Sequence, residues 1–424
     1  MRVALPFGKT TCRIELPDAN VVKVLEARHG AAVSDPDAAI SRALAEPIGC
    51  RPLAELARGH DEAVVVICDM TRPVPNRTML PPILAALDSA GIRREGITTL
   101  VATGLHRPNE GTELERMVGE DIAHAYRIVN HRARVAAEQA HLGVTDRGTP
   151  IDIDAVYARA PLKITTGYIE PHLMAGFSGG RKVAALGCGG ERLIRAVHSP
   201  TFIEHPNSIE GVIEGNILHD ELTEITRRVG MDFMVNVTMD RDRRITGVFA
   251  GDFDTAWTAG CAFARDAVLD TVDASCDIVV TSCGGFPQDC TYYQSAKGLT
   301  GAMHVARPGG TIIMLSACEE GIGGAHFREL CRSVASPEQF TRDFVEGDRS
   351  EIDQWCVHNF TRALRKCDGI MIDRGLTDEE RSIILPRSAA TFETALAVAL
   401  DKHGGGGARI AVIPDGPNVL AQLE

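Results

Sequence analysis

The chain has 424 residues, of which 44% are hydrophobic and 24% are charged, so it is long enough for about two domains with cores of their own. Its formal net charge of −13 argues against nucleic acid as a partner, because polyanion binders carry a basic excess or a basic stripe. No apolar run reaches the roughly 18 residues of a membrane-spanning helix, and the polar N-terminus does not read as a secretory signal. We therefore expect no membrane partner and a cytoplasmic location.

Short runs of β-branched residues alternate with longer helical patterns along the chain. Strand–helix alternation is typical of α/β proteins whose sheets are mostly parallel and flanked by helices. The predicted strands lie at residues 63–68, 98–102, 127–130, 164–167, 233–238, 277–282, 311–315 and 409–413, and the clearest helices at 81–90, 111–118, 255–269 and 292–305.

A change of pattern marks the predicted domain boundary at residues 267–274, where a helical stretch ends and a new strand–helix unit begins. We expect an N-terminal domain over residues 1–268 and a C-terminal domain over residues 274–403. The glycine run at 404–407 is typical of a flexible linker. The strand after it could return, so that residues 408–424 complete the N-terminal domain.

Two predicted strands end in polar segments. Asp69 follows the first strand and lies three residues before Arg72, so its carboxylate can orient a guanidinium that binds a carboxylate or phosphate. His106 follows the second strand, two residues after Gly104, where a general base could lie. Taken alone, each segment is also compatible with a surface ion pair or an incidental loop histidine. Because ligands of open α/β sheets bind at the carboxyl ends of the strands, we group the two segments in one candidate site.

The densest constellation follows the predicted strand 164–167. His172 comes first, then a Gly/Ser loop at 176–180 whose backbone N–H groups could bind a phosphate, and Arg181 and Lys182 close the loop. The spacing matches neither the Walker A pattern nor the G-x-G-x-x-G dinucleotide pattern. The loop therefore favours a mononucleotide-like phosphate over ATP or free NAD.

Two further stretches carry candidate ligands. His198 ends a helical stretch at 191–198, and a metal held there would need its other ligands from a cofactor, because one histidine is too few. On the predicted helix at 292–305, Gln294 and Lys297 are three residues apart and Tyr293 and Lys297 four, so one face presents groups that suit a carboxylate. A half-exposed amphipathic helix remains an alternative for the second stretch.

The cysteine and lysine content adds two points. None of the twelve cysteines forms a Cys-x-x-Cys pair, so neither a zinc-ribbon nor a thioredoxin-type site is indicated, and we expect reduced, mostly buried thiols. Lysine supplies only seven of the 44 basic residues. Because lysine, unlike arginine, can lose its proton and act as a nucleophile, this bias directs attention to Lys182 and Lys297.

Together these stretches resemble the nickel-dependent lactate racemase family, whose members are racemases and epimerases of 2-hydroxy acids. The matching segments occur in the order of the family and span both expected domains. They are residues 69–73, 104–107, Pro171 with His172, residues 176–182, His198 and residues 293–298.

The resemblance implies a nickel-pincer nucleotide, a pyridinium-3,5-bisthiocarboxylic acid mononucleotide whose nickel is bound by one ring carbon, two sulfur atoms and one protein histidine. By the family pattern His198 is that nickel ligand and Lys182 can carry the cofactor through a covalent thioamide. Enzymes of cofactor synthesis would be needed for activation. Further cofactor contacts are expected from Asp69, Met70, Thr71, Arg72, Thr103, Ser178 and Gly179.

The resemblance also implies the reaction, inversion at C2 of a small 2-hydroxy acid by proton-coupled hydride transfer. His106 and His172 would be the two acid/base residues, because each enantiomer presents its hydroxyl group to a different side. Arg72, Gln294 and Lys297 would anchor the carboxylate, and Tyr293 would line the site. With anchors in both expected domains, we expect the active site in an interdomain cleft.

Other functions remain open at this point. Relatives act on lactate, malate, aryl-lactates and sugar acids such as aldonates, and side-chain selectivity depends on a pocket shape that the sequence does not give. Residues 184–188 depart from the family pattern, which has a Pro-Gly pair there. A nicotinamide-type oxidoreductase is disfavoured by the missing G-x-G-x-x-G pattern. An inert relative that only binds a nucleotide or an organic acid is disfavoured because both His106 and His172 are present.

Overall fold

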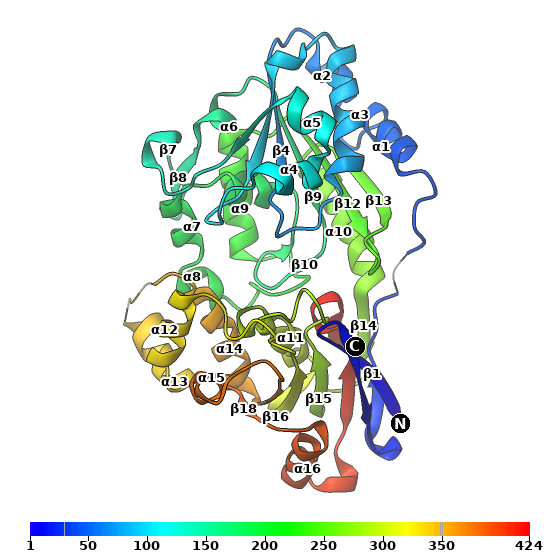
Figure 1. The fold of residues 1–424 in the computed structure, drawn as a ribbon, viewed down its shortest axis with the longest axis vertical. Helices are drawn as coiled ribbons and strands as arrows, with labels where there is room; N and C mark the ends of the chain where they lie inside the picture. The colour runs from blue at the N-terminus through cyan, green and yellow to red at the C-terminus, as the bar shows by residue number, and fades with distance from the viewer. Residues whose placement is uncertain (29, 348, 350) are drawn as a thin grey trace. The chain divides into compact units, whose positions relative to one another are not determined.

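The computed structural model describes residues 1–28, 30–347, 349 and 351–424. By internal contacts the chain divides into two compact units. Unit 1 consists of residues 1–28, 199–204 and 268–424, and unit 2 consists of residues 29–198 and 205–267. The chain therefore crosses between the units several times, and each unit has its own central sheet (Figure 1).

Unit 2 is built around a six-stranded sheet of order β13-β12-β9-β4-β5-β6. β4 (Ala63–Cys68) pairs in parallel with both β5 (Ile97–Ala102) and β9 (Lys163–Tyr168). Its Ala-Val-Val-Val-Ile-Cys sequence is buried along nearly its whole length, as expected for a parallel strand covered on both faces. From β4 the chain continues to β5 and β6 on one side and later to β9 and β12 on the other. The strand order therefore reverses between β4 and β9, where open α/β sheets bind their ligands.

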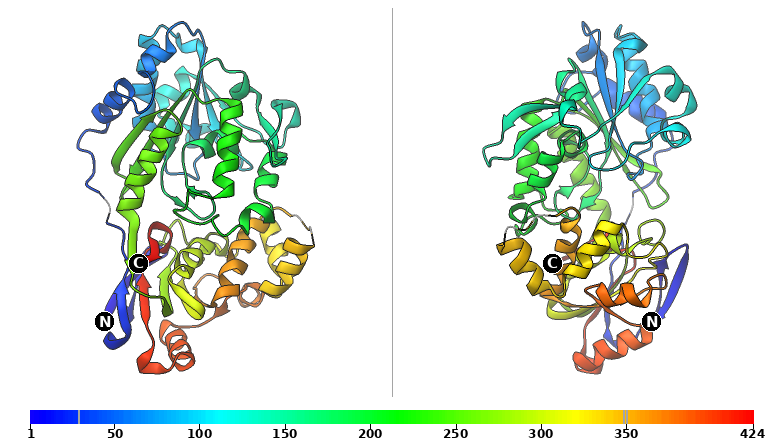
Figure 2. Two further views of the ribbon diagram at one scale, coloured as in Figure 1. Left: turned by 180° about the vertical axis from the view of Figure 1, so that it is seen from behind. Right: turned by 60° about the vertical axis from the view of Figure 1, so that its left-hand side comes forward.

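Helices cover both faces of this sheet. Apolar residues of α1 to α4 pack on one face against alternate residues of β4 and β12, and α9 and α10 lie on the other face (Figure 2). The helices of unit 2 are α1 (Pro36–Ala45), α2 (Leu53–Ala57), α3 (Asn76–Ser89), α4 (Gly111–Val118), α5 (Glu120–Ala125), α6 (Ala155–Arg159), α7 (Glu191–Val197), α9 (Ile217–Val229) and α10 (Thr255–Val268). The remaining strands are β6 (Arg127–Asn130), β7 (Gln139–Val144), β8 (Pro150–Asp154), β10 (Pro171–His172), β11 (Gly176–Phe177), β12 (Phe233–Met239) and β13 (Ile245–Gly251).

Unit 1 has a second six-stranded sheet, of order β18-β17-β16-β15-β19-β3, in which every neighbouring pair is parallel. Successive residues of β15 alternate between its faces, as strand geometry requires. Val279 packs under α11 and α14, whereas Ile278 and Val280 pack with the N-terminal hairpin and α16. The strand order reverses between β15 and β19.

The elements of unit 1 follow the same α/β pattern. Its strands are β1 (Arg2–Phe7), β2 (Thr10–Glu15), β3 (Val21–Val24), β14 (Leu269–Val272), β15 (Cys276–Ser282), β16 (Ala306–Leu315), β17 (Asp368–Ile372), β18 (Arg387–Ser388), β19 (Ile410–Ile413) and β20 (Leu420–Leu423). Its helices are α8 (Pro200–Ile203), α11 (Tyr292–Met303), α12 (Ala325–Ser333), α13 (Pro337–Phe340), α14 (Gln354–Lys366), α15 (Asp378–Ile383) and α16 (Phe392–Lys402).

The α/β class with mostly parallel sheets is confirmed, but the course of the two chain ends differs from expectation. Residues 408–424 do not complete the N-terminal part, because β19 hydrogen-bonds to β15 and to β3 within unit 1. Residues 1–28 lie in unit 1 for the same reason, since β3 is the edge strand of its sheet. The change of unit at residues 267/268 lies beside the expected boundary. All twelve cysteines are free thiols, and no helix among the described residues is long and apolar enough to cross a membrane.

Candidate active site

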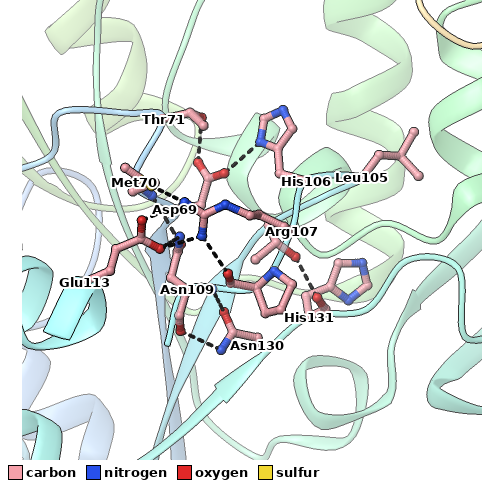
Figure 3. Close-up of polar contacts among 12 residues, drawn as sticks. Asp69, Met70, Thr71, Leu105, His106, Arg107, Asn109, Glu113, Asn130 and His131 are labelled. Atoms are coloured by element: carbon pink, nitrogen blue, oxygen red, sulfur yellow. Dashed lines mark hydrogen bonds and ion pairs between the residues drawn. The ribbon is translucent and has the colours of Figure 1, made fainter. Parts of the chain in front are cut away.

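The clearest catalytic arrangement is a carboxylate–imidazole pair at the carboxyl ends of β4 and β5. The Asp69 side chain is buried, and its Oδ2 lies 2.6 Å from Nδ1 of the half-exposed His106 ring (Figure 3). Because an ionised carboxylate only accepts hydrogen bonds, Nδ1 carries the proton, and Nε2 of the neutral ring has its lone pair available. This is the geometry of a general base oriented by a carboxylate.

The second oxygen of Asp69 corrects one expectation. Its Oδ1 accepts a 2.7 Å hydrogen bond from the hydroxyl of Thr71, so both carboxylate oxygens are used and neither orients Arg72. Among the described residues the Arg72 guanidinium has no ion-pair or hydrogen-bond partner. An arginine side chain that follows β4, near the point where the strand order reverses, and that has no partner in the described part of the protein is suited to bind an anionic ligand.

A polar network fixes the loop that carries His106. Arg107 forms a two-pronged ion pair with Glu113, at 2.7 Å for both bonds, and also reaches the sulfur of Met70 (Figure 3). The hydrogen bond from Arg107 lowers the pKa of Glu113 to about 2. Asn109 joins the same network through Glu113 and through the backbone amide of Met70. The two strand ends are thus held together independently of any ligand.

His172 lies on a short β-hairpin that follows β9. The short strands β10 and β11 pair antiparallel, with His172 opposite Gly176. The ring is turned back onto this turn, because its Nδ1 accepts hydrogen bonds from the backbone N–H groups of Met174 and Ala175, at 3.3 and 3.1 Å. The second predicted acid/base residue therefore has a different environment from the first.

The Gly/Ser loop after β11 is held largely by its own hydrogen bonds. The hydroxyl of Ser178 donates to the carbonyl of Tyr168 at 2.6 Å, and the amide of Gly180 donates to Asn236. Gly179 has a φ of +74°, and a Cβ there would come within 2.3 Å of the Asn236 side chain, so only glycine fits. The amides of Ser178, Gly180 and Lys182 are engaged within the protein, which leaves fewer of them for a phosphate than the sequence suggested.

Arg181 does not close the loop as expected. Its side chain is buried, stacks over the ring of Trp257 at 4.1 Å, and forms a 2.7 Å ion pair with Asp254. Burial lowers the pKa of Arg181 to about 10, because removal from water disfavours the charged form. Arg181 therefore anchors the loop to α10 and to the residue before it. Of the two adjacent cations, only Lys182 remains a candidate for binding a ligand.

Lys182 and His198 lie close enough to influence one another. Lys182 precedes a helical turn, Val183–Gly187, and His198 caps α7 at its C-terminal end. The pKa of His198 is lowered to about 4, mainly by burial and further by the charge of Lys182. The Nδ1–H of His198 donates to the carbonyl of Ile194 at 2.7 Å. The ring is therefore neutral near pH 7 with a lone pair on Nε2, which is the form that binds a metal.

Electrostatics place Lys182 near the end of β4 as well. The charges of Arg72 and Lys182 both act on the thiol of Cys68, the last residue of β4, although burial dominates and raises the pKa of that thiol to about 12. Candidate residues from separate sequence segments therefore lie near one another at the carboxyl ends of the central strands of unit 2.

A buried histidine that follows β6 was not predicted from the sequence. His131 follows β6, and its ring nitrogens lie 2.8 Å from an Asp154 carboxylate oxygen and 2.8 Å from the carbonyl of Gly189. Its own carbonyl accepts a 2.6 Å hydrogen bond from the hydroxyl of Thr103, which is therefore engaged within the protein. His131 ties the loop after β5 to the segment before α7. Its position directly after a predicted strand was the signal that could have revealed it.

We expect Asp154→Ala to destabilise the protein by about 3–5 kcal/mol, because it removes one partner of a buried ion pair. Asp154 also caps α6 through the amide of Val156, which adds to the loss. Thermal unfolding followed by circular dichroism should show the melting temperature fall by roughly 6–15 °C. The matched control is Asp146→Ala, whose exposed ion pair with Arg228 should shift the melting temperature by less than about 2 °C. Equal shifts for the two variants would contradict a structural role for the His131–Asp154 pair.

The substrate residues expected on α11 belong to unit 1, where α11 follows β15. Tyr293 packs edge-on against Phe327 at 4.9 Å, and its hydroxyl accepts a 3.1 Å hydrogen bond from Trp355. Burial raises the pKa of Tyr293, so the phenol stays neutral. Gln294 and Lys297 are half-buried on the same helix, three residues apart as expected.

A metal would need ligands from outside the protein. Among the described residues no group of three or more histidine, cysteine, aspartate or glutamate side chains could hold a metal ion. His198 could supply one ligand, and a cofactor would have to supply the others.

Comparison with known proteins identifies the family. Models of the lactate racemase N-terminal and C-terminal domains match residues 7–211 and 271–421. A lactate racemase of Lactiplantibacillus plantarum is 34% identical over 426 residues, and one of Thermoanaerobacterium thermosaccharolyticum is 32% identical, with 99% of this chain and 99% of each relative covered. The chain belongs to the lactate racemase family. It is therefore an enzyme of the racemase class of isomerases, and the predicted resemblance is confirmed.

Solved structures agree with this family assignment. The lactate racemase apoprotein of Thermoanaerobacterium thermosaccharolyticum superposes with a TM-score of 0.94 at 30% identity, and both chains are covered completely. A protein from Thermotoga maritima matches with a TM-score of 0.70 over 92% of this chain, but at 15% identity it shows the fold alone.

Proposed function

We propose that this member of the lactate racemase family racemises lactate or a similarly small 2-hydroxy acid, by proton-coupled hydride transfer to a nickel-pincer nucleotide. The observation that carries the proposal is the Asp69–His106 pair, which presents a proton-accepting Nε2 at the carboxyl ends of β4 and β5, beside the point where the strand order reverses. Such a group is needed to take the hydroxyl proton when a 2-hydroxy acid is oxidised to its keto acid.

The surroundings of Lys182 and His198 fit the proposed cofactor. His198 is neutral with Nε2 as a potential nickel ligand, and Lys182 lies near it, where it would carry the cofactor covalently. When bound, the nucleotide would supply an acceptor that takes up a hydride and returns it. Further contacts to the cofactor are proposed for Asp69, Met70, Thr71, Arg72, Thr103, Ser178 and Gly179. The hydroxyls of Thr103 and Ser178 donate within the protein, so these two would act chiefly by shaping the loops.

The remaining site residues would bind and orient the substrate. We assign His106 and His172 to the hydroxyl groups of the two enantiomers and Arg72 to the carboxylate, since its guanidinium can bind a carboxylate with two parallel hydrogen bonds. The roles of Gln294 and Lys297 as further anchors, and of Tyr293 as a lining residue, rest on the sequence resemblance. Enzymes of cofactor synthesis are the proposed partners for activation.

A screen of enantiopure 2-hydroxy acids in D₂O tests the proposal. The protein is produced together with cofactor-synthesis enzymes, and loss of optical activity is followed for lactate, malate, an aryl-lactate and an aldonate. We expect the fastest loss with lactate, and we expect C2 to remain largely unlabelled because the same hydrogen is returned. Extensive deuterium at C2 would show proton abstraction instead, and an absence of nickel in the active protein would contradict the proposed cofactor.

A further inference from the structure

The turn that carries His172 is closed by backbone contacts as well as by the ring. The amide of Gly211 donates to the carbonyl of Gly176, which has a φ of +73°. A Cβ at Gly176 would come within 2.3 Å of the carbonyl oxygen of Val212. The turn therefore fits against the following segment only with glycine at this position.

Asn216 holds the same turn from the N-terminus of α9. Its side-chain amide nitrogen donates to the carbonyls of Met174 and Val212, at 2.9 and 3.0 Å. Its oxygen accepts from the amides of Leu218 and His219, which caps the helix. The side chain is fully buried, and both donors and the oxygen are used. Asn216 thus couples the start of a stable helix to the amide-bearing turn under His172.

This arrangement fixes where the neutral His172 ring carries its proton. A nitrogen that receives hydrogen bonds from two N–H groups has to be unprotonated, so Nδ1 has the lone pair and Nε2 has the hydrogen. His106 is the reverse, because its Nδ1 faces a carboxylate oxygen. We propose that the two histidines of this site are held in opposite tautomers, with Nε2 a proton acceptor in His106 and a hydrogen-bond donor in His172, and that Asn216 is the positioning residue that maintains the second tautomer.

The opposite tautomers have a consequence for proton transfer in the reaction, and this consequence rests on the proposed function. His106 takes the hydroxyl proton on Nε2 and becomes an imidazolium whose Nδ1–H still donates to Asp69, so no hydrogen bond of the network breaks. His172 can accept a proton on Nε2 only if its own proton first sits on Nδ1, where the amides of Met174 and Ala175 point. Those two amides must turn away before His172 acts as a base. In the resting enzyme the Nε2–H group of His172 is instead able to donate a hydrogen bond.

The tautomers can be read directly from the full-length protein without cofactor. The chain is labelled with ¹⁵N-histidine, and long-range ¹H–¹⁵N spectra are recorded at about pH 8, where ordinary histidines are neutral. His106→Gln and His172→Gln assign the two rings. We expect the Nε2–H pattern for His172 and the Nδ1–H pattern for His106. His141, whose Nδ1 lies 2.7 Å from Asp152, is the internal reference for the His106 pattern. An Nδ1–H pattern for His172 would overturn the proposal.

Asn216→Asp tests the positioning residue. The aspartate keeps an oxygen that caps α9 but places a second acceptor against the carbonyl of Met174, so the turn should open and the His172 population should shift about two- to tenfold toward Nδ1–H. Asn207→Asp is the control, because it makes the same charge change at an exposed hydrogen bond to Gly215 and should leave the His172 spectrum unchanged. If circular dichroism shows that Asn216→Asp does not fold, Asn216→Ser replaces it. An unchanged spectrum in a folded variant would refute the role of Asn216.

The readout needs neither nickel nor turnover, so it separates the two proposals. The expected tautomers in a protein that never racemises a hydroxy acid would refute the proposed function alone. Active protein with matching tautomers at both histidines would refute the opposite-tautomer proposal alone.

Discussion

In protein loaded with cofactor, His198→Ala is expected to lose nickel, whereas His106→Ala and His172→Ala are expected to keep nickel and lose racemisation. The reason lies in the ring of His198, whose Nδ1–H is held by the carbonyl of Ile194 and whose pKa of about 4 keeps Nε2 unprotonated. A methyl group offers no ligand. Because the loss of a residue that merely orients a ligand costs about 10- to 100-fold in metal affinity, loss of the ligand itself should cost at least tenfold.

Metal analysis after desalting measures this effect, and racemase assays on the same samples separate it from loss of catalysis. His141→Ala serves as a surface control, because His141 lies half-exposed on the β7–β8 hairpin and its ring contacts Asp152, a residue outside the candidate site. Wild-type nickel content in His198→Ala would contradict the metal assignment. Near-normal turnover in His106→Ala or His172→Ala would contradict the assignment of two acid/base residues.

The strands that position the site could be predicted because their signal is local. Ala63–Cys68 is a continuous apolar run that ends at Asp69, and β6 and α4 lie at the residues expected for them. The pairing of strands is not local. β3 and β19 come from opposite ends of the chain and are neighbours in one sheet, so no pattern within either segment could indicate that residues 408–424 belong to unit 1.

The same limit explains which site partners were predicted wrongly. A spacing of three residues suggested that Asp69 orients Arg72, but the carboxylate faces His106, which comes from the next strand in the sheet. Arg181 was expected to close the glycine loop, but Trp257 and Asp254 from a distant segment bury it. The sequence indicated which side chains are candidates for the chemistry, whereas the order of the strands decides which of them meet.

The Asp69–His106 pair leads to the second large effect. Asp69→Asn preserves the size of the side chain and removes its charge, so the imidazolium formed when His106 takes a proton is no longer stabilised by a carboxylate. If the amide nitrogen faces Nδ1, the ring also adopts the wrong tautomer. We expect kcat to fall about 10²–10⁴-fold, the range found for general-base catalysis and for the equivalent change in serine protease triads. KM and nickel content should change much less than kcat, since the proposed carboxylate anchor is Arg72 and the proposed nickel ligand is His198.

Steady-state kinetics with both enantiomers measure this effect, and the control is a second carboxylate of the same network. Glu113→Gln removes the exposed ion pair with Arg107 and does not contact His106, so it should change kcat less than about fivefold. Equal losses in the two variants would show that general disruption of the loop causes the effect. A kcat close to that of the wild type in Asp69→Asn would show that His106 works without its carboxylate. The large loss in Asp69→Asn alone would show that the short contact between Oδ2 and Nδ1 maintains the base.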